Sequence, residues 1–222
     1  MGKTVVLDGP AGSGKSTTAI ELAKRLGYIY LDTGAMYRAL TLKCLRLGKT
    51  KANLRDNLDK ILKDTFIQIE PIAGGGLKIF LDREDVTAQI RSNEVDGFVS
   101  EVAAVDEIRE YMQELQRQFA RDFDIVAEGR DLGTYVFPHA DVKIFLVADL
   151  DIRAKRRMLQ KDADEEALAN FRENLAKRDR IDSGRQHSPL KKADDAIEVD
   201  TTDLTFEEQV QKILEICHQK LK

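Results

Sequence analysis

A glycine-rich octapeptide near the start of the chain carries the clearest chemical signal in the sequence. Residues 9–16 read GPAGSGKS and fit the pattern G-x-x-x-x-G-K-[ST]. Glycines in this pattern let backbone N–H groups converge on phosphate oxygens, and the N-terminus of the following helix adds positive potential. Lys15 is then expected to reach the β- and γ-phosphates, and Ser16 is expected to hold Mg²⁺. The pattern predicts that the chain binds ATP or GTP.

Arginines with helical spacing supply a second signal further along the chain. Arg178, Asp182 and Arg185 are four and then three residues apart, so on a helix they would share one face. A second cationic stripe, at offsets of three and four residues, consists of Arg153, Arg156 and Arg157. The two stripes could close over a polyphosphate, because phosphoryl transfer needs guanidinium groups around the equatorial oxygens. The alternative is a pair of solvated helices with surface salt bridges.

Polar residues also follow two short segments that resemble strand ends or turns. Asp32-Thr33-Gly34 leads into a helical pattern that carries Arg38, and Glu128-Gly129-Arg130-Asp131 follows an apolar run. Ligands of α/β proteins bind at the ends of parallel strands, so Arg38 and Arg130 are candidate binding residues. Glu128 is expected near Mg²⁺ through a water molecule. A helix-capping or loop acid is the alternative interpretation of Glu128.

No histidine is a candidate general base, because His139, His187 and His218 lie outside these segments. A phosphate acceptor needs no base, since its oxygen is already anionic near neutral pH and catalysis reduces to positioning and charge compensation. The N-K-x-D segment that GTPases use to read guanine is absent from the sequence. These observations favour a small-molecule kinase with a second anion-binding pocket.

The elements that must position these residues indicate a parallel α/β core. Buried strands are predicted from the apolar runs 4–8, 125–127, 142–147 and 196–199. Helical spacing over Ser16–Leu26 directly follows the glycine-rich loop, and Gly27 is a plausible C-terminal cap. Helical stretches separate the strands, which is typical of a parallel sheet covered by helices.

The middle of the chain has a different pattern. Residues 65–70 and 77–81 are strand-like, and Ala73-Gly74-Gly75-Gly76 between them predicts the turn of an antiparallel hairpin. We therefore expect one kinase domain with core segments 1–32, 110–150 and 186–222, an insert over 33–109, and a charged helical lid over 151–185.

Composition excludes several classes of protein. Hydrophobic residues make up 42% of the chain and charged residues 33%, and no apolar stretch approaches the ~20 residues of a membrane span. The net charge of −4 argues against a protein that coats nucleic acid. No secretory signal pattern is present, so a cytoplasmic location is the expectation. Cys44 and Cys217 are expected to be reduced structural thiols.

Taken together, the segments above resemble the bacterial cytidylate kinase family from residue 3 to about residue 220. The blocks that carry the resemblance are 9–17, Leu31-Asp32-Thr33-Gly34-Ala35-Met36-Tyr37-Arg38, Ile90-Arg91-Ser92, Glu128-Gly129-Arg130-Asp131-Leu132-Gly133-Thr134 and Arg156-Arg157-Met158-Leu159. The resemblance implies a P-loop kinase fold with a parallel core sheet, an inserted monophosphate-binding subdomain that contains a small antiparallel sheet, and a mobile helical lid.

The resemblance also implies a role for each candidate residue. ATP and Mg²⁺ would be held by the loop Gly9, Pro10, Ala11, Gly12, Ser13, Gly14, Lys15, Ser16 and Thr17. The lid residues Arg153, Arg156 and Arg157 would reach the ATP phosphates. The monophosphate would be held by Thr33, Arg38, Arg130 and Arg185. The sugar would be held by Arg178 and Asp182. Cytosine would be read by Ser100, Arg109 and Asp131, since a carboxylate can accept a hydrogen bond from the N4 amino group of cytosine, whereas uracil would present an acceptor to that carboxylate.

The expected reaction is ATP + (d)CMP → ADP + (d)CDP, catalysed by a monomer that acts on small nucleotides and not on nucleic acid or membranes. Lys15, Arg130, Arg178, Arg185, Arg156 and Arg157 would stabilise the transferring phosphoryl group. One alternative is a kinase for another acceptor, such as UMP, AMP or shikimate. The other is a nucleotide-binding protein without turnover.

Overall fold

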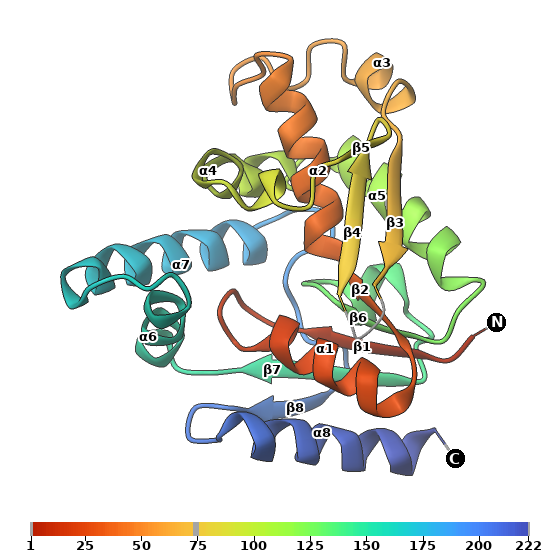
Figure 1. The fold of residues 1–222 in the computed structure, drawn as a ribbon, viewed down its shortest axis with the longest axis vertical. Coiled ribbons are helices and arrows are strands. Elements are labelled where there is room, and N and C mark those ends of the chain that lie inside the picture. Colours follow the sequence, from red (N-terminus) through yellow and green to blue (C-terminus); the bar gives the residue numbers. More distant parts are fainter. Residues whose placement is uncertain (1, 73–75, 222) are drawn as a thin grey trace.

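The computed structural model describes residues 2–72 and 76–221. Its centre is a five-stranded sheet in the order β2-β6-β1-β7-β8, in which all neighbours are parallel (Figure 1). The strands are β1 (Thr4–Asp8), β2 (Ile29–Asp32), β6 (Ile125–Glu128), β7 (Val142–Val147) and β8 (Ile197–Asp200). Apolar runs form the three middle strands because both faces of a parallel sheet are buried. The predicted parallel α/β core is confirmed.

The four predicted strands are all present, but β2 was not predicted. Its sequence IYLD is only four residues long and ends at the charged Asp32. The strand forms because it pairs with β6, with Asp32 opposite Glu128 in the register. Pairing with a strand almost a hundred residues away is a tertiary effect that a local pattern does not contain.

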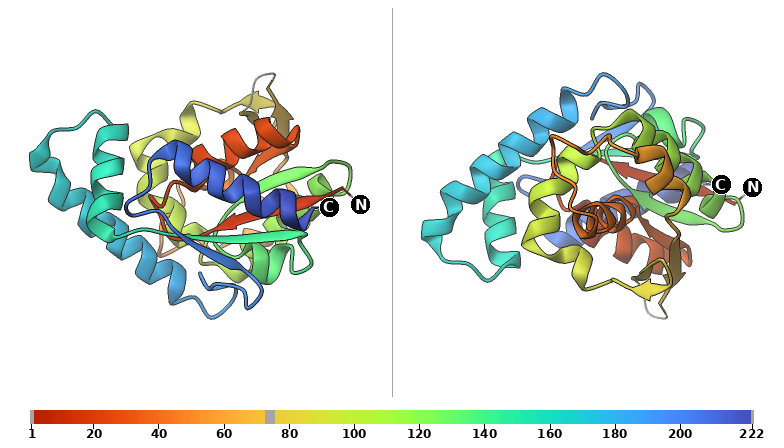
Figure 2. Two further views of the ribbon diagram at one scale, coloured as in Figure 1. Left: turned by 90° about the horizontal axis from the view of Figure 1, so that it is seen from below. Right: turned by 90° about the horizontal axis from the view of Figure 1, so that it is seen from above.

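Helices cover both faces of this sheet. α1 (Lys15–Leu26) ends as predicted at Gly27, which has a φ of 71°. α8 (Phe206–Lys220) starts with a capping box between Thr205 and Glu208 and packs beside α1, as the view from below shows (Figure 2, left). α5 (Asp106–Ala120) lies on the other side of the sheet, next to the short π-helix η2 (Leu132–Val136).

A second layer stands above the carboxyl ends of the sheet. It contains α2 (Thr33–Arg46), α3 (Leu58–Lys63), the 3₁₀ turn η1 (Gln89–Arg91) and α4 (Asn93–Val102). Its antiparallel sheet consists of β3 (Ile67–Pro71), β4 (Leu77–Leu81) and β5 (Glu84–Asp85). The predicted hairpin is confirmed as β3 and β4, and β5 is an additional short strand. The predicted turn over 73–76 falls mostly on residues 73–75, which lie outside the described residues.

Two helices project from the side of the core (Figure 1). These are α6 (Leu150–Gln160) and α7 (Leu168–Ser183), joined through the 3₁₀ turn η3 (Glu165–Ala167). They have their own small apolar cluster, formed by Ala11, Ala154 and Leu175 with Leu150, Leu168 and Phe171 packed against it. Because Ala11 belongs to the glycine-rich loop, this cluster joins the projecting pair to the loop.

The end of α7 corrects one prediction. Arg185 was expected to share a helix face with Arg178 and Asp182, but α7 ends at Ser183 and the N–H of Gly184 donates to Arg180 O. Glycine lowers helix stability, so the helix stops before Arg185. The guanidinium of Arg185 nevertheless folds back and pairs with Asp182. The three side chains come together, but through a turn and not through helical spacing.

Within 2–72 and 76–221, no helix is long and apolar enough to cross a membrane. Cys44 and Cys217 are both buried and form no disulfide. Burial raises the pKa of the Cys44 thiol to about 11 and that of Cys217 to about 12, so both thiols are protonated at neutral pH.

Candidate functional site

A cavity of about 880 Å³ opens between the carboxyl ends of the core strands, the upper layer and the projecting helices. It collects most of the predicted site residues, namely Ala11, Gly12, Gly14, Lys15, Ser16, Thr17, Thr33, Arg38, Ser100, Arg109, Glu128, Arg130, Asp131, Arg156, Arg157, Arg178, Asp182 and Arg185. Ten cationic and five anionic side chains line it, although the chain as a whole has a net charge of −4. This excess of positive charge suits a ligand that carries several phosphates.

The glycine-rich loop follows β1 and wraps around the side chain of Lys15. Gly9 has a φ of 146°, and a Cβ on it would lie 2.1 Å from Leu146 O, so only glycine fits there. Lys15 Nζ donates to Pro10 O at 2.6 Å and lies 3.4 Å from Ser13 Oγ. Burial, with the nearby charge of Arg130, lowers the pKa of Lys15 to about 7. An anion in the loop would favour the charged form of this lysine.

Gly9, Pro10, Ser13 and Arg153 do not line the cavity. The Arg153 side chain is 8% exposed, and its Nη1 donates to Asp179 at 2.6 Å and to Ala11 O at 2.9 Å. Asp179 also accepts from the N–H of Ala11. Arg153 therefore braces the glycine-rich loop against α6 and α7.

Two buried carboxylates lie side by side where β2 and β6 end. Asp32 is opposite Glu128 across the strand pair, and Tyr30 Oη donates to Glu128 at 2.6 Å. Burial, together with the charge of Asp32, raises the pKa of Glu128. Arg91 Nη2 donates to Asp32 at 2.6 Å. These carboxylates and the Ser16 hydroxyl line the same cavity, and such hard oxygen donors are the ligands that Mg²⁺ prefers, directly or through water.

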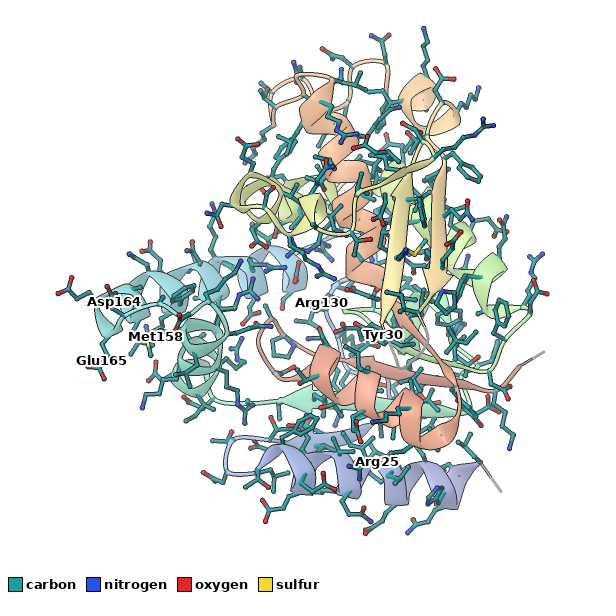
Figure 3. The ribbon with its side chains drawn as sticks, viewed as in Figure 1. Arg25, Tyr30, Arg130, Met158, Asp164 and Glu165 are labelled. Carbon is teal, nitrogen blue, oxygen red and sulfur yellow. The ribbon has the colours of Figure 1, made fainter. Side chains whose placement is uncertain are left out.

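Guanidinium groups gather around Asp182 at the end of α7. Arg130 Nε donates to Asp182 at 2.9 Å, and Arg185 pairs with the other carboxylate oxygen. Burial would raise the pKa of Asp182, but Arg130, Arg185 and Arg178 hold it below its usual value. Burial next to Arg130 also lowers the pKa of Arg178 to about 10. The single negative charge of Asp182 thus offsets only part of the positive charge of the three arginines. A bound anion would neutralise more of it. In Figure 3, Arg130 lies near the C-terminal end of α7.

A third group lies deeper, between α2, α4 and α5. Arg109 Nη2 donates to Asp131 at 2.5 Å, its Nη1 donates to Ala103 O at 3.0 Å, and its guanidinium lies 5.5 Å from the ring centre of Tyr37. Among the described residues, the buried Nε atoms of Arg109, Arg178 and Arg185 have no hydrogen-bond partner. Unpaired buried donors that border a cavity favour a polar ligand. Ser100 lines the cavity beside this pair.

Arg156 and Arg157, the other two arginines expected in the lid, line the cavity. Arg156 donates to Thr201 Oγ1 at 3.0 Å and to Thr201 O at 2.6 Å. Arg157 donates to Gln160 at 2.8 Å and lies 3.5 Å from Asp96. Arg156 is close to the glycine-rich loop, because Thr201 Oγ1 also donates to Ser13 O, and Arg157 is close to α4.

Several lining residues were missed by sequence reasoning. They are Tyr30, Asp32, Tyr37, Arg91, Asp96, Ile20, Leu204, Phe206 and Gln209. Asp32 and Tyr37 lie within the block 31–38, so their position beside Thr33 and Arg38 could have identified them as candidate site residues. Leu204 and Phe206 add apolar surface to the cavity lining, and such surface could take a flat base. Asp96 has no distinguishing local pattern and is placed only by the fold.

The family-model and sequence comparisons agree on one family. The family model described as Cytidylate kinase matches residues 5–219. A relative from Geobacillus sp. (strain WCH70), named "Cytidylate kinase", is 47% identical over 219 residues, which cover 98% of this chain and 97% of the relative. A relative of the same name from Carboxydothermus hydrogenoformans is 48% identical, with 97% of each chain covered. A crystal structure of a gluconokinase from Sinorhizobium meliloti 1021 superposes with a TM-score of 0.50 at 14% identity, over 99% of this chain and 94% of that one, and shows a shared fold.

Proposed function

Because this chain belongs to the cytidylate kinase family, we propose that it transfers the γ-phosphate of ATP to CMP or dCMP and releases ADP and CDP or dCDP. The observation that carries the proposal is one cavity that is lined by the glycine-rich loop, by three cations around Asp182, and by the Arg109–Asp131 pair. These are a donor site, an acceptor-phosphate site and a site able to recognise a base.

The donor triphosphate would lie along the loop 9–17. Lys15 is partly discharged by burial, and phosphate oxygens would restore its charge and draw Nζ away from Pro10 O. Arg156 and Arg157 would approach the outer phosphates from α6. The apolar surface of Leu204 and Phe206 would contact the donor base.

The acceptor phosphate would lie between Arg38, Arg130 and Arg185, with Thr33 at the start of α2. The sugar would contact Arg178 and Asp182, and the base would contact Ser100, Arg109 and Asp131. Asp131 would accept from the N4 amino group of cytosine, and the unpaired Nε of Arg109 is a donor suited to the acceptor atoms of the ring. Uracil would place an oxygen against the Asp131 carboxylate, which is unfavourable.

The residues fit a magnesium ion, because Ser16, Asp32 and Glu128 all supply oxygen atoms to the cavity and the charge of Asp32 still raises the pKa of the buried Glu128. Ser16, Asp32 and Glu128 would hold the ion, which would supply positive charge to offset the charge that develops on the phosphates during transfer. The chain's own contribution is to align the acceptor oxygen with the γ-phosphorus and to surround the equatorial oxygens with guanidinium groups. No general base is required, since the attacking oxygen is an anion.

We propose that residues 151–185, which include α7 and all but the first residue of α6, act as a lid over the donor and that 33–109 acts as the monophosphate-binding insert. Closure would exclude water and protect the γ-phosphate from hydrolysis.

The proposed enzyme is a monomer that acts on free nucleotides and not on nucleic acid. A cytoplasmic location is proposed because ATP and CMP are cytoplasmic metabolites.

The experiment that tests this function measures ADP release from ATP and Mg²⁺ with CMP, dCMP, UMP, AMP and shikimate as separate acceptors. Strong turnover with CMP and dCMP is the expected result. Preference for another acceptor would still indicate a kinase, but it would contradict the proposal that Ser100, Arg109 and Asp131 bind cytosine. Absence of ADP release with every acceptor would favour a nucleotide-binding protein without turnover.

A further inference from the structure

One carboxylate in the cavity contacts cations from two different parts of the fold. Asp96 belongs to the first turn of α4, and its Oδ1 accepts from Arg38 Nη2 at 2.5 Å. Its other oxygen lies 3.5 Å from Arg157 Nη2 and 3.7 Å from Lys161 Nζ. Arg38 comes from α2, whereas Arg157 belongs to α6 and Lys161 follows its last turn. Asp96 therefore connects the upper layer to the projecting helices.

The contact between Asp96 and Arg38 fixes the orientation of the Arg38 guanidinium in the cavity. Arg38 Nη1 donates to Ile90 O at 3.1 Å while Nη2 donates to Asp96, so two of its nitrogens are anchored to protein atoms. The Arg38 side chain is only 10% exposed. A guanidinium held from two sides keeps one orientation, which lowers the entropy that a bound phosphate must remove. Arg38 is thus preorganised by Asp96.

The contacts of Asp96 with Arg157 and Lys161 are more exposed to solvent, and they are electrostatic. The Asp96 side chain is 22% exposed, that of Arg157 26% and that of Lys161 36%. Burial would raise the pKa of Asp96, but Arg38, Arg157 and Lys161 lower it, so the group is an anion at neutral pH. Contacts of 3.5 to 3.7 Å between partly exposed groups are weak individually. Such contacts can form and break as α6 moves.

We propose that Asp96 is a positioning residue that couples the two substrate sites, by holding Arg38 for the acceptor phosphate while attracting the lid cations Arg157 and Lys161. The inference rests on the proposed function. A donor triphosphate that draws α6 inward would strengthen the contacts to Asp96, and the ordered Arg38 would then bind the acceptor phosphate more tightly. By linkage, the acceptor would strengthen donor binding by the same factor.

The test compares Asp96→Asn with Glu94→Gln, because both changes remove one negative charge from the first turn of α4. Glu94 is exposed and makes no salt bridge within the described residues. The affinity for CMP is measured by calorimetry alone and with saturating Mg²⁺ and a β,γ-methylene analogue of ATP. The ratio of the two dissociation constants is the coupling factor, which changes in overall folding stability alone would not alter.

In the unchanged protein the analogue is expected to tighten CMP binding roughly tenfold, within the usual range of coupling energies. Asp96→Asn should reduce this factor to about one to threefold, whereas Glu94→Gln should retain it. Asp96→Glu should recover part of it. If Asp96→Asn folds poorly, Lys161→Gln removes the other side of the contact and should lower the factor without disturbing Arg38.

Four results would overturn the inference: coupling that survives both Asp96→Asn and Lys161→Gln, equal loss in Glu94→Gln, no coupling in the unchanged protein, or no binding of CMP. The last result would also remove the proposed function, whereas the first three would leave CMP kinase activity in place. The two ideas are therefore separable by whether the unchanged protein binds and phosphorylates CMP.

Discussion

Arg153 Nη1 donates to the carboxylate of Asp179 at 2.6 Å, and this pair holds the glycine-rich loop against the two projecting helices. Asp179 also accepts from the N–H of Ala11, while Arg153 donates to Ala11 O. Both backbone groups of Ala11 are thus bonded to α6 and α7. Motion of these helices must either preserve the pair or disturb the loop.

Replacement of Asp179 by Asn is expected to weaken this connection. The change removes the charge that compensates the buried Arg153 and should lower the free energy of unfolding by about 1–3 kcal/mol. Because the pair touches the donor loop, KM for ATP should rise by a larger factor than KM for CMP. Thermal unfolding and steady-state kinetics measure the two effects. Equal increases in the two KM values would contradict the assignment.

Lys15 should make ATP binding depend on pH. Its pKa is lowered to about 7 in the free protein, and phosphate oxygens favour the charged form. Above pH 7 binding must therefore take up a proton, and ATP affinity should fall by up to about tenfold per pH unit between pH 7.5 and 8.5. Calorimetry in buffers of different ionisation enthalpy measures the proton uptake.

Lys15→Arg is the control for this prediction, because arginine stays charged throughout that range. The variant should bind ATP more weakly at pH 7 but should lose the additional dependence on pH. An identical slope in the variant would assign the titration to another group.

Asp131→Asn is expected to relax base selectivity. An amide can present its N–H₂ to the O4 of uracil, whereas the carboxylate cannot donate. The ratio of kcat/KM for CMP to that for UMP should fall at least tenfold, mostly through a lower value for CMP. The paired Arg109 loses a charged partner, so thermal stability is measured in parallel. A selectivity ratio that stays unchanged would argue against base reading by Asp131.

Asp8 should give the fold an unusual pH dependence. It is buried at the end of β1 and accepts from the N–H groups of Leu132 and Gly133, and burial raises its pKa to about 6. The folded state therefore binds the proton more tightly than the unfolded state, whose carboxyl titrates near 3.8. Between about pH 4 and 6 this group makes the folded protein less stable as the pH rises.

Comparison with Asp8→Asn isolates this effect from the other carboxylates. Asparagine does not titrate, although it offers one acceptor where the carboxylate offers two. The free energy of unfolding of the unchanged protein minus that of the variant should decrease from pH 4.5 to pH 6.5 and then level off. A difference that increases over this range would mean that Asp8 has a lowered pKa.

Local patterns were sufficient for much of the fold. The loop 9–16, the helix after it and the strands β1, β6, β7 and β8 follow from residue spacing, because glycine placement and apolar runs act within a few residues. β2 was missed because it depends on pairing with β6. The relation of Arg185 to Asp182 was predicted by helical spacing, yet the chain achieves it through a turn after Ser183.

The candidate site divides in the same way. The sequence alone determined which residue types could bind phosphate and which family the blocks resemble, since those signals lie in short contiguous segments. Only the tertiary structure decided that Arg153 is bonded to Asp179 and Ala11, and that Asp96 lies between Arg38 and α6. These partners are 26 or more residues apart in sequence. They meet because the parallel strands bring their carboxyl-terminal loops to one edge, where unpaired charges must find partners as they lose water.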